Sequence, residues 1–286
     1  MASPPAGQAS VTAVVLLAAV LHAAWNALLK GAGDRLAVLA VLSGTGVVLC
    51  AAAVPLLPPP APASRGFLAV SAALHVGYEV FLLQSYRFGD LSQVYPVARG
   101  TAPLLVAGVA ALVVGERLGP LQLSGVLVVS AGLALLVGSG RPSPDRRTAL
   151  GFALATGVCI AAYTVADGLG VRRSGSALGY TAWLMLLLSL PIPLYAVASR
   201  GRRLLAGLRG QLAAGAAAGV LSLAAYALVL WAQTRGALAV VAALRETSVL
   251  VAALLGTVFL GERFGPRRVL AAALVAAGIV LLNLPR

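Results

Sequence analysis

Apolar residues fill most of this chain in blocks of about 20 residues, separated by short stretches that contain Gly, Pro or Arg. A helix of that length crosses the hydrocarbon core of a bilayer. Because unpaired backbone groups are costly in hydrocarbon, only helices and closed barrels span a membrane, and these blocks are too long and too little alternating for barrel strands. The pattern therefore predicts an all-α integral membrane protein.

Ten such blocks are predicted as transmembrane helices. Pro58, Pro59 and Pro60 cannot continue a helix, whereas Pro120 and Pro266 stand where the first turn of a helix accepts proline. The first half of the chain, residues 1–140, holds segments 10–29, 36–57, 66–86, 91–114 and 120–138. The second half, residues 141–286, holds segments 149–169, 178–198, 211–233, 238–260 and 266–284.

The two halves are related by an internal repeat, which fixes the architecture before any motif does. A shift of 146 residues places residues 94–136 on residues 240–282 without a gap. The matches include residues that apolar composition does not explain: Arg99 with Arg245, Gly115-Glu116-Arg117 with Gly261-Glu262-Arg263, and Gly119-Pro120 with Gly265-Pro266.

Five spans in each half make the second half enter the membrane in the opposite direction, because five is an odd number. The repeat therefore predicts two inverted five-helix bundles. Secondary transporters use this arrangement to expose a site at the membrane midplane first to one side and then to the other. The alternative, a duplication that only builds a stable bundle, stays open.

Composition and motifs narrow the class of protein further. The chain is 60% hydrophobic and 10% charged, unlike soluble domains. Its net charge of +13 comes from Arg residues in short loops, where orientation signals belong, so nucleic-acid binding is not expected. The sequence has no HExxH, GxSxG or P-loop motif, and two His and two isolated Cys residues are too few for most metal sites. We expect neither an enzyme nor a cofactor.

Three stretches resemble the EamA type of the drug/metabolite transporter superfamily: HAAWNALLK, YRFGDLSQVYPVARGTAPLL, and the paired turns GERLGP and GERFGP. The resemblance covers the whole chain. It implies ten helices in two inverted repeats, a central cavity lined by the first, third and fourth helices and their counterparts, and transport of small metabolites, often as export driven by protons or exchange. Small multidrug-resistance relatives use a Glu in their first helix. This chain has His22 there, so their proton chemistry is not carried over.

Ionisable side chains inside the apolar blocks are the main functional candidates. One at the bilayer centre costs about 2.5–3.5 kcal/mol, so it faces the bundle interior or water. Arg99 lies in the fourth segment, Tyr95 one turn earlier points the same way, and Pro96 bends the helix between them. Because a guanidinium is a planar fork of donors, Arg99 and Arg245 are candidates to bind a substrate carboxylate or phosphate. Alternatively, they bridge helices by pairing with acidic residues or backbone carbonyls.

Other polar residues extend this candidate site. Glu79 lies beside Tyr78 in the third segment, where it either couples transport to protons or forms an ion pair with Arg99, the alternative that we favour. Glu246 follows Arg245 on a different face of its helix. The remaining candidates for cavity walls are His22, Trp25 and Asn26 on the first segment, Tyr163 and Asp167 on the sixth, and Tyr226 on the eighth. Trp25 is equally suited to anchoring at the membrane interface.

The pattern as a whole predicts a secondary transporter that moves a small metabolite, amino acid or drug by alternating access, and the resemblance implies export. The alternative is a non-transporting membrane protein, such as a lipid-carrier flippase subunit or a sensor. We expect a monomer or homodimer in the cell membrane, with lipids around it, a small-molecule substrate, protons as a candidate coupling ion and no nucleic acid.

The orientation in the membrane stays open. Most Lys and Arg residues outside the spans lie in the loops that follow odd-numbered segments. The positive-inside rule places these loops in the cytoplasm and both termini outside. The resemblance implies termini inside.

Overall fold

The computed structural model describes residues 5–30, 33–136, 145–201, 203–260 and 265–284, and within these ranges it is helical without a strand. The first half contains α1 (Pro5–Lys30), α2 (Arg35–Ala53) with a 3-10 turn (Val54–Leu56), α3 (Pro62–Phe88), α4 (Leu91–Val109) with a π-helical turn (Ala110–Val114), and α5 (Pro120–Leu135). The second half contains α6 (Arg146–Arg173), α7 (Ala177–Ser189), α8 (Pro191–Arg200), α9 (Arg203–Arg209), α10 (Leu212–Gln233), α11 (Leu238–Arg245), α12 (Ser248–Leu260) and α13 (Pro266–Asn283). The all-α prediction is confirmed.

Nine helical segments of the described residues are long and apolar enough to cross a membrane, and α5 is a shorter apolar helix. The end of the predicted fifth span, Gly138, lies outside the described residues. The start of the first helix contacts the end of the last one. Thr12 of α1 donates to Asn283 of α13 at 2.5 Å, and Gln8 donates to the carbonyl of Leu282 at 3.4 Å. Because the start of α1 and the end of α13 lie on the same side of the membrane, the chain crosses the membrane an even number of times. We therefore count α5 as the tenth spanning helix.

Two predicted spans are broken rather than continuous. The seventh divides into α7 and α8 at Pro191, which has no amide hydrogen to continue the helical bonding pattern. The ninth divides into α11 and α12 at Glu246 and Thr247. There Thr247 N donates to Leu244 O at 3.2 Å, a tighter i to i−3 bond in place of the α-helical one. The short helix α9 lies in a stretch that the sequence pattern treats as a loop.

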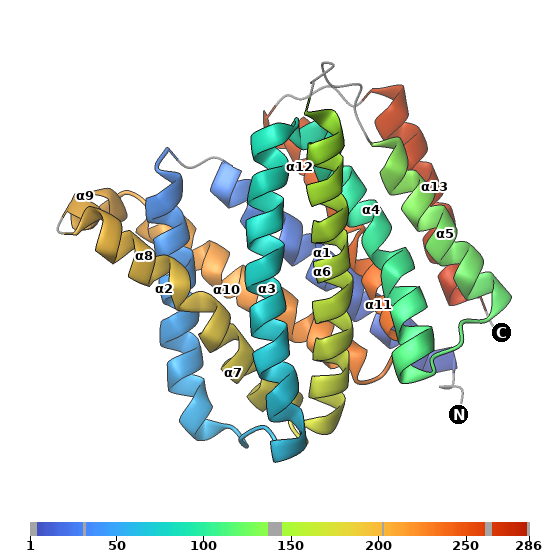
Figure 1. The fold of residues 1–286 in the computed structure, drawn as a ribbon, viewed down its shortest axis with the longest axis horizontal. Helices are drawn as coiled ribbons and strands as arrows, with labels where there is room; N and C mark the ends of the chain where they lie inside the picture. The colour runs from blue at the N-terminus through green and yellow to red at the C-terminus, as the bar shows by residue number, and fades with distance from the viewer. Residues whose placement is uncertain (1–4, 31–32, 137–144, 202, 261–264, 285–286) are drawn as a thin grey trace.

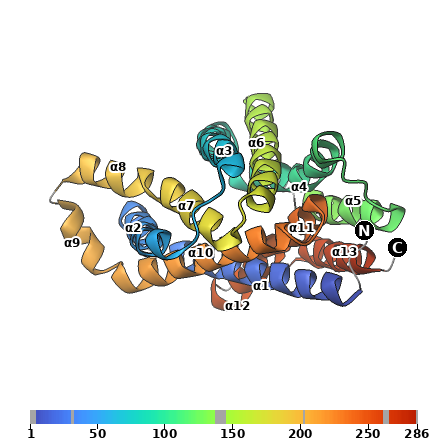
Figure 2. The ribbon, with the colours of Figure 1, turned by 90° about the horizontal axis from the view of Figure 1, so that it is seen from below.

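Helices of one half pack against helices of the other half in exchanged pairs. In such a pair, a contact between two helices recurs between their counterparts with the two halves interchanged. Taken in order, α1 to α5 correspond to α6, α7 with α8, α10, α11 with α12, and α13. The third helix of the first half, α3, packs against α6, the first of the second half, and α10 packs against α1 in the same way. Likewise α4 packs against α6, and α11 and α12 pack against α1. Figure 1 shows α3 beside α6, and in Figure 2 the last helices of each half, α5 and α13, lie together at one edge.

Equivalent helices also begin with equivalent local structure. Gly119 and Gly265 have nearly the same extended conformation, with φ of −67° and −72°, and each precedes a proline in the first turn of α5 or α13. At the second helix of each half, Asp34 accepts a bond from Ala37 N and Ser176 accepts one from Gly179 N. A side-chain oxygen that caps a helix satisfies an amide left free by the first turn. The matching Gly-Pro pairs of the repeat thus begin α5 and α13 in the same way.

Small residues allow close helix contacts, as expected of packing in membranes. A Cβ added at Gly215 would lie 2.6 Å from Val41 of α2, and one at Gly219 would lie 2.6 Å from the carbonyl of Leu42, so both glycines let α10 pack closely on α2. Another close crossing joins α5 and α13. A Cβ at Gly278 would lie 2.6 Å from Val129 and 3.0 Å from the carbonyl of Gly125.

Gly278→Ala is expected to lower the free energy of unfolding by about 1–3 kcal/mol, because overpacked interiors lose stability on that scale. The obstacle is partly backbone, which a rotamer change does not relieve. Thermal unfolding in detergent measures the effect, and Gly151→Ala is the control because a Cβ there meets nothing within 4 Å. Equal melting temperatures for the two variants would contradict this packing.

Candidate functional site

A buried ion pair joins the two halves at the centre of the bundle. Arg99 of α4 donates from Nη1 to Oε1 of Glu246 at 3.0 Å, and the two residues are 4% and 2% exposed. The second terminal nitrogen of Arg99, Nη2, lies 3.2 Å from Nε2 of His22 on α1. Because a guanidinium only donates, this nitrogen of His22 accepts. Three helices therefore meet at one guanidinium.

Irregular backbone presents these side chains. Pro96 and Pro103 both lie inside α4, on either side of Arg99 along the chain. Glu246 stands at the break between α11 and α12. The guanidinium carbon of Arg99 also lies 5.4 Å from the ring centroid of Tyr95, so the prediction that these two side chains point the same way is confirmed. Broken helices at the midplane are a recurring feature of transporter binding sites.

Several polar atoms around this ion pair are buried without a hydrogen-bond partner among the described residues. They are the donors Trp25 Nε1 and Arg99 Nε and the acceptor Glu246 Oε2. Trp25 meets His22 edge to face at 5.1 Å, so all three atoms belong to one cluster. The side-chain amide of Asn26 donates to the backbone carbonyl of His22 at 2.8 Å. Buried polar groups are nearly always paired, so unpaired ones at one place indicate room for water or a ligand.

The predicted ion pair between Glu79 and Arg99 is wrong. Arg99 pairs with Glu246, and Glu79 lies on an exposed face of α3. The helical register explains the difference, because Tyr78 and His75 face the neighbouring helix α6 while Glu79 is turned away from it. A role for Glu79 in proton coupling stays a prediction.

Arg245 has a different environment from Arg99. Its guanidinium carbon lies 5.6 Å from the ring centroid of Tyr226 on α10, and its side chain is half-buried. Among the described residues, no carboxylate lies within ion-pair distance of it. Glu246, next along the chain, is directed to Arg99 as expected for a different helical face. Arg245 is therefore a half-buried cation without an ion-pair partner among the described residues.

A second polar cluster surrounds Asp167 of α6, which is 1% exposed. Its Oδ2 accepts from the Tyr226 hydroxyl at 2.5 Å and its Oδ1 accepts from Tyr180 at 3.4 Å. His75 of α3 lies 3.2 Å from the same Tyr226 hydroxyl and stacks on Tyr163 at 3.9 Å. Tyr78 meets Tyr163 edge to face at 6.0 Å, so these predicted residues do come together.

Sequence reasoning did not single out Tyr180, and it left His75 out of the site. Tyr180 is the first long polar side chain of α7, a helix that otherwise reads as apolar packing. For His75 a signal was available: it lies three residues before Tyr78 and so shares its helical face.

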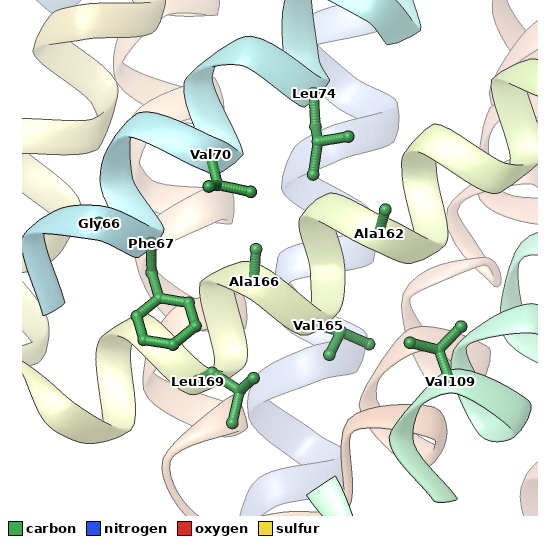
Figure 3. A pocket seen from close by; sticks show the side chains of 9 residues that line it. All are labelled: Gly66, Phe67, Val70, Leu74, Val109, Ala162, Val165, Ala166 and Leu169. Carbon is green, nitrogen blue, oxygen red and sulfur yellow. The ribbon is translucent and has the colours of Figure 1, made fainter. Parts of the chain in front are cut away.

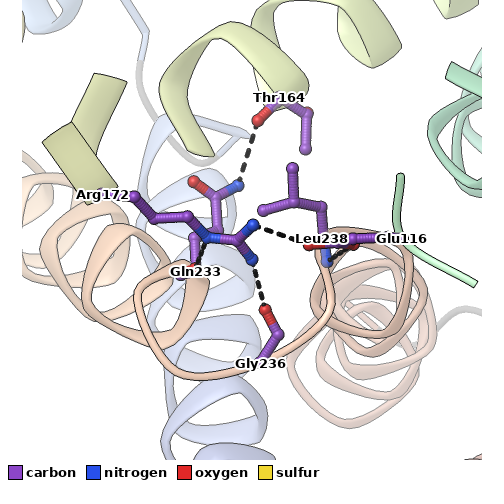
Figure 4. Close-up of polar contacts among 6 residues, drawn as sticks. All are labelled: Glu116, Thr164, Arg172, Gln233, Gly236 and Leu238. Carbon is purple, nitrogen blue, oxygen red and sulfur yellow. Dashed lines mark hydrogen bonds and ion pairs between the residues drawn. The ribbon is translucent and has the colours of Figure 1, made fainter. Parts of the chain in front are cut away.

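The end of the bundle that carries the termini is closed by a second ion pair. Arg172, at the end of α6, donates to Glu116 at 2.7 Å and to the carbonyls of Gln233 and Gly236, both at 2.8 Å (Figure 4). The other oxygen of Glu116 accepts from Leu238 N at 2.8 Å. These segments follow even-numbered spans, so all lie on one side. Glu116 belongs to the repeated GER motif, whose second copy lies outside the described residues.

Arg172→Lys is expected to loosen this closure, because an ammonium group cannot reproduce three bonds that a guanidinium fork makes in fixed directions. Hydrogen–deuterium exchange at the amide of Leu238 should become faster, and stability should fall by about 1–3 kcal/mol. Arg173→Lys is the control, since Arg173 lies over the ring of Phe67 and takes no part in the closure. Unchanged exchange at Leu238 would show that Arg172 does not hold this end.

On the opposite side, Asp34 before α2 pairs with Arg200 at the end of α8. Donation from the Arg200 guanidinium, followed by donation from the Ala37 amide, lowers the pKa of Asp34. A depressed carboxyl pKa contributes stability above the unfolded value and loses it as pH falls through the folded value.

A small acid-sensitive loss of stability is therefore expected below about pH 3.8, the ordinary value for Asp34. Asp34→Asn should remove that dependence and slightly lower the melting temperature at neutral pH. The control is Asp90→Asn, because Asp90 precedes α4 without a side-chain capping bond. Identical pH profiles for wild type and Asp34→Asn would contradict the pair.

An apolar groove of about 430 Å³ lies between α3, α4 and α6 (Figure 3). Phe67, Leu74 and Val109 are among its lining residues, and every lining side chain is apolar. A polar metabolite needs a few groups that fix its orientation. This groove has none, so the polar clusters around Arg99 and Asp167 are the better candidates for a binding site.

The fold, with its long apolar helices, is that of a polytopic helical membrane protein. The chain belongs to the EamA-like transporter family, whose model matches residues 147–284. It is 32% identical to "Uncharacterized protein PA1977" of Pseudomonas aeruginosa over 96% of this chain and 95% of that protein. A solved crystal structure of a protein shares its fold with a TM-score of 0.74, at 21% identity and with 96% of both chains covered. The resemblance to the drug/metabolite transporters is confirmed.

Proposed function

We propose that this protein is a secondary transporter that carries a small metabolite with an anionic group across the cell membrane by alternating access. The observation that carries the proposal is the buried polar centre between the two halves, where donors and an acceptor have no hydrogen-bond partner in the part of the chain that the structure describes. In helices surrounded by lipid, such groups are expensive and mark substrate pathways. Membership of a transporter family supports the same function.

The charges of the described residues favour an anionic group in the substrate. Arg99 is neutralised by Glu246, whereas Arg245 lies over the face of Tyr226 and has no carboxylate within ion-pair distance among the described residues. A carboxylate or phosphate would pair with Arg245 and accept two parallel bonds from its guanidinium. The rings of Tyr95, Trp25 and Tyr163 offer faces for an apolar or aromatic remainder.

The arrangement of the helices supports alternating access. In this proposal, residues 1–140 and 141–286 are the two repeats, and the packing of their helices in exchanged pairs supports that division. Rocking of one repeat against the other would break the Arg172–Glu116 closure at one end while the central site stays intact. The break at Glu246 and Thr247 places an adaptable turn beside the substrate site.

The test is a screen of carboxylates, amino acids, nucleobases and cationic drugs on purified protein, first by thermal shift and then by flux into proteoliposomes. We expect compounds with a carboxylate or phosphate to stabilise the protein and to cross the membrane. Stabilisation by cations alone would refute the anion assignment, and binding without flux would refute transport.

A further inference from the structure

Asp167 is a buried acid with hydroxyl partners and no cationic partner. Among the described residues, no Lys, Arg or His nitrogen lies within ion-pair distance of its carboxylate, which the hydroxyls of Tyr226 and Tyr180 contact. A lone ionised carboxylate in a dry interior is costly and tends to take up a proton instead. Asp167 therefore differs from Glu246, which forms an ion pair with the Arg99 guanidinium.

His75 is oriented by its own helix so that one ring nitrogen is left for Tyr226. Its Nδ1 lies 2.9 Å from the backbone carbonyl of Ser71. A carbonyl oxygen only accepts, so Nδ1 carries a hydrogen. The other nitrogen, Nε2, lies 3.2 Å from the Tyr226 hydroxyl, and the ring is fixed by stacking on Tyr163.

The Tyr226 hydroxyl has one hydrogen but faces two acceptors, Asp167 Oδ2 and His75 Nε2. One additional proton satisfies all three groups in either of two ways. In the first, it sits on His75 Nε2, which donates to Tyr226, which donates to the Asp167 carboxylate. In the second, it sits on Asp167, which donates to Tyr226, which donates to His75. Without it, a lone pair of His75 faces a lone pair of Tyr226.

We propose that Asp167, Tyr226 and His75 form a binding site for one proton, and that this proton is carried together with the substrate anion. The proton comes from water on the open side and returns to water on the other, with no other bond made or broken. The coupling part of this proposal rests on the proposed function, because it needs a substrate anion at Arg245.

Arg245 connects the two sites, since its guanidinium lies over the ring of the same Tyr226. A bound proton makes the surroundings of Arg245 more positive by one charge and so favours an anion there. By linkage, an anion at Arg245 favours the proton to the same extent. Several titratable, charged or hydroxyl groups face Asp167 from the helices packed around it. They are Ser71 and His75 of α3, Tyr180 of α7, Tyr226 of α10 and Arg245 of α11, with Tyr163 on α6 itself.

Infrared difference spectroscopy of the protein in lipid nanodiscs tests the site without any substrate. Acidification should produce a carboxylic-acid band that is lost in Asp167→Asn and kept in Glu79→Gln, the exposed acid of α3. Tyr226→Phe removes only the hydroxyl that links Asp167 to His75. We expect the Asp167 band to remain in this variant, but no longer to change together with the imidazole bands of His75. A spectrum that loses no carboxylic-acid band in Asp167→Asn, or an Asp167 band that still follows the imidazole bands in Tyr226→Phe, would overturn the proton site.

The same spectra test the coupling through Arg245. In Arg245→Gln the carboxylic-acid band should persist to more alkaline pH, because a cation that opposes protonation has been removed. An unchanged pH range would overturn the coupling. Because no flux is measured, the test of the proton site is independent of the proposed transport. A silent flux screen would refute transport and the coupling that rests on it, whereas an absent Asp167 band would refute the proton site and leave transport standing.

Discussion

Arg99→Ala is expected to destabilise the protein by about 3–5 kcal/mol, because it leaves the carboxylate of Glu246 buried without its partner. The second oxygen of Glu246 already lacks a hydrogen bond among the described residues, so nothing nearby compensates for the loss. The acceptor nitrogen of His22 would lose its donor as well. Thermal unfolding in detergent, or equilibrium unfolding in mixed micelles, measures the effect.

The matched control replaces both charges by apolar residues of similar size, as Arg99→Met with Glu246→Leu. Such replacements of a buried ion pair are often neutral or stabilising. We therefore expect the double variant to be close to wild type in stability but inactive in transport, because the polar centre is gone. A single variant as stable as wild type would show that the charge on Glu246 is solvated or neutral.

Arg245→Gln is expected to weaken binding of a carboxylate substrate by about 30-fold or more, which corresponds to about 2 kcal/mol. Arg245 has no acidic partner among the described residues, so its removal strands no buried charge and the protein should keep its stability. A thermal-shift titration with a carboxylate from the screen gives the affinity. Arg245→Gln is thus expected to lower substrate affinity and keep stability, whereas Arg99→Ala is expected to lower stability.

The control for Arg245→Gln is Arg235→Gln, an exposed arginine that lies over Trp231 in the linker before α11. It changes the net charge by the same amount but lies outside the polar centre. Equal losses of affinity in both variants would mean that the anion responds to the overall charge of the protein and not to Arg245.

The fold could be predicted from the sequence because lipid leaves few alternatives. Blocks of apolar residues determine where helices cross, and the Gly-Pro pairs before α5 and α13 determine where two of them begin. The breaks within the seventh and ninth spans were not predicted. Pro191 gave a signal for the first, whereas the break at Glu246 and Thr247 has no Pro or Gly, and it depends on tertiary contacts such as that between Glu246 and Arg99.

Most residues of the candidate site were predicted, although Tyr180 and His75 were missed, but the pairing of the charged residues was not. Burial cost alone identified Arg99, Arg245, Asp167 and Glu246 as inward-facing candidates. Which acid meets which arginine depends on helix rotation and depth, which apolar composition does not determine. The repeat did contain a signal for Arg99 and Glu246, because residues at matching positions of two inverted halves approach one another near the symmetry axis. Their separation of 147 positions differs by one from the repeat shift of 146.

The most direct test of the central claim is exchange in proteoliposomes, with a labelled carboxylate from the screen outside and the same unlabelled compound inside. A carrier that exposes one site alternately to each side should take up label faster when unlabelled compound is present inside, and Arg245→Gln should abolish this stimulation. Uptake at the same rate with and without the internal compound, or equal uptake in wild type and Arg245→Gln, would contradict alternating access through this site.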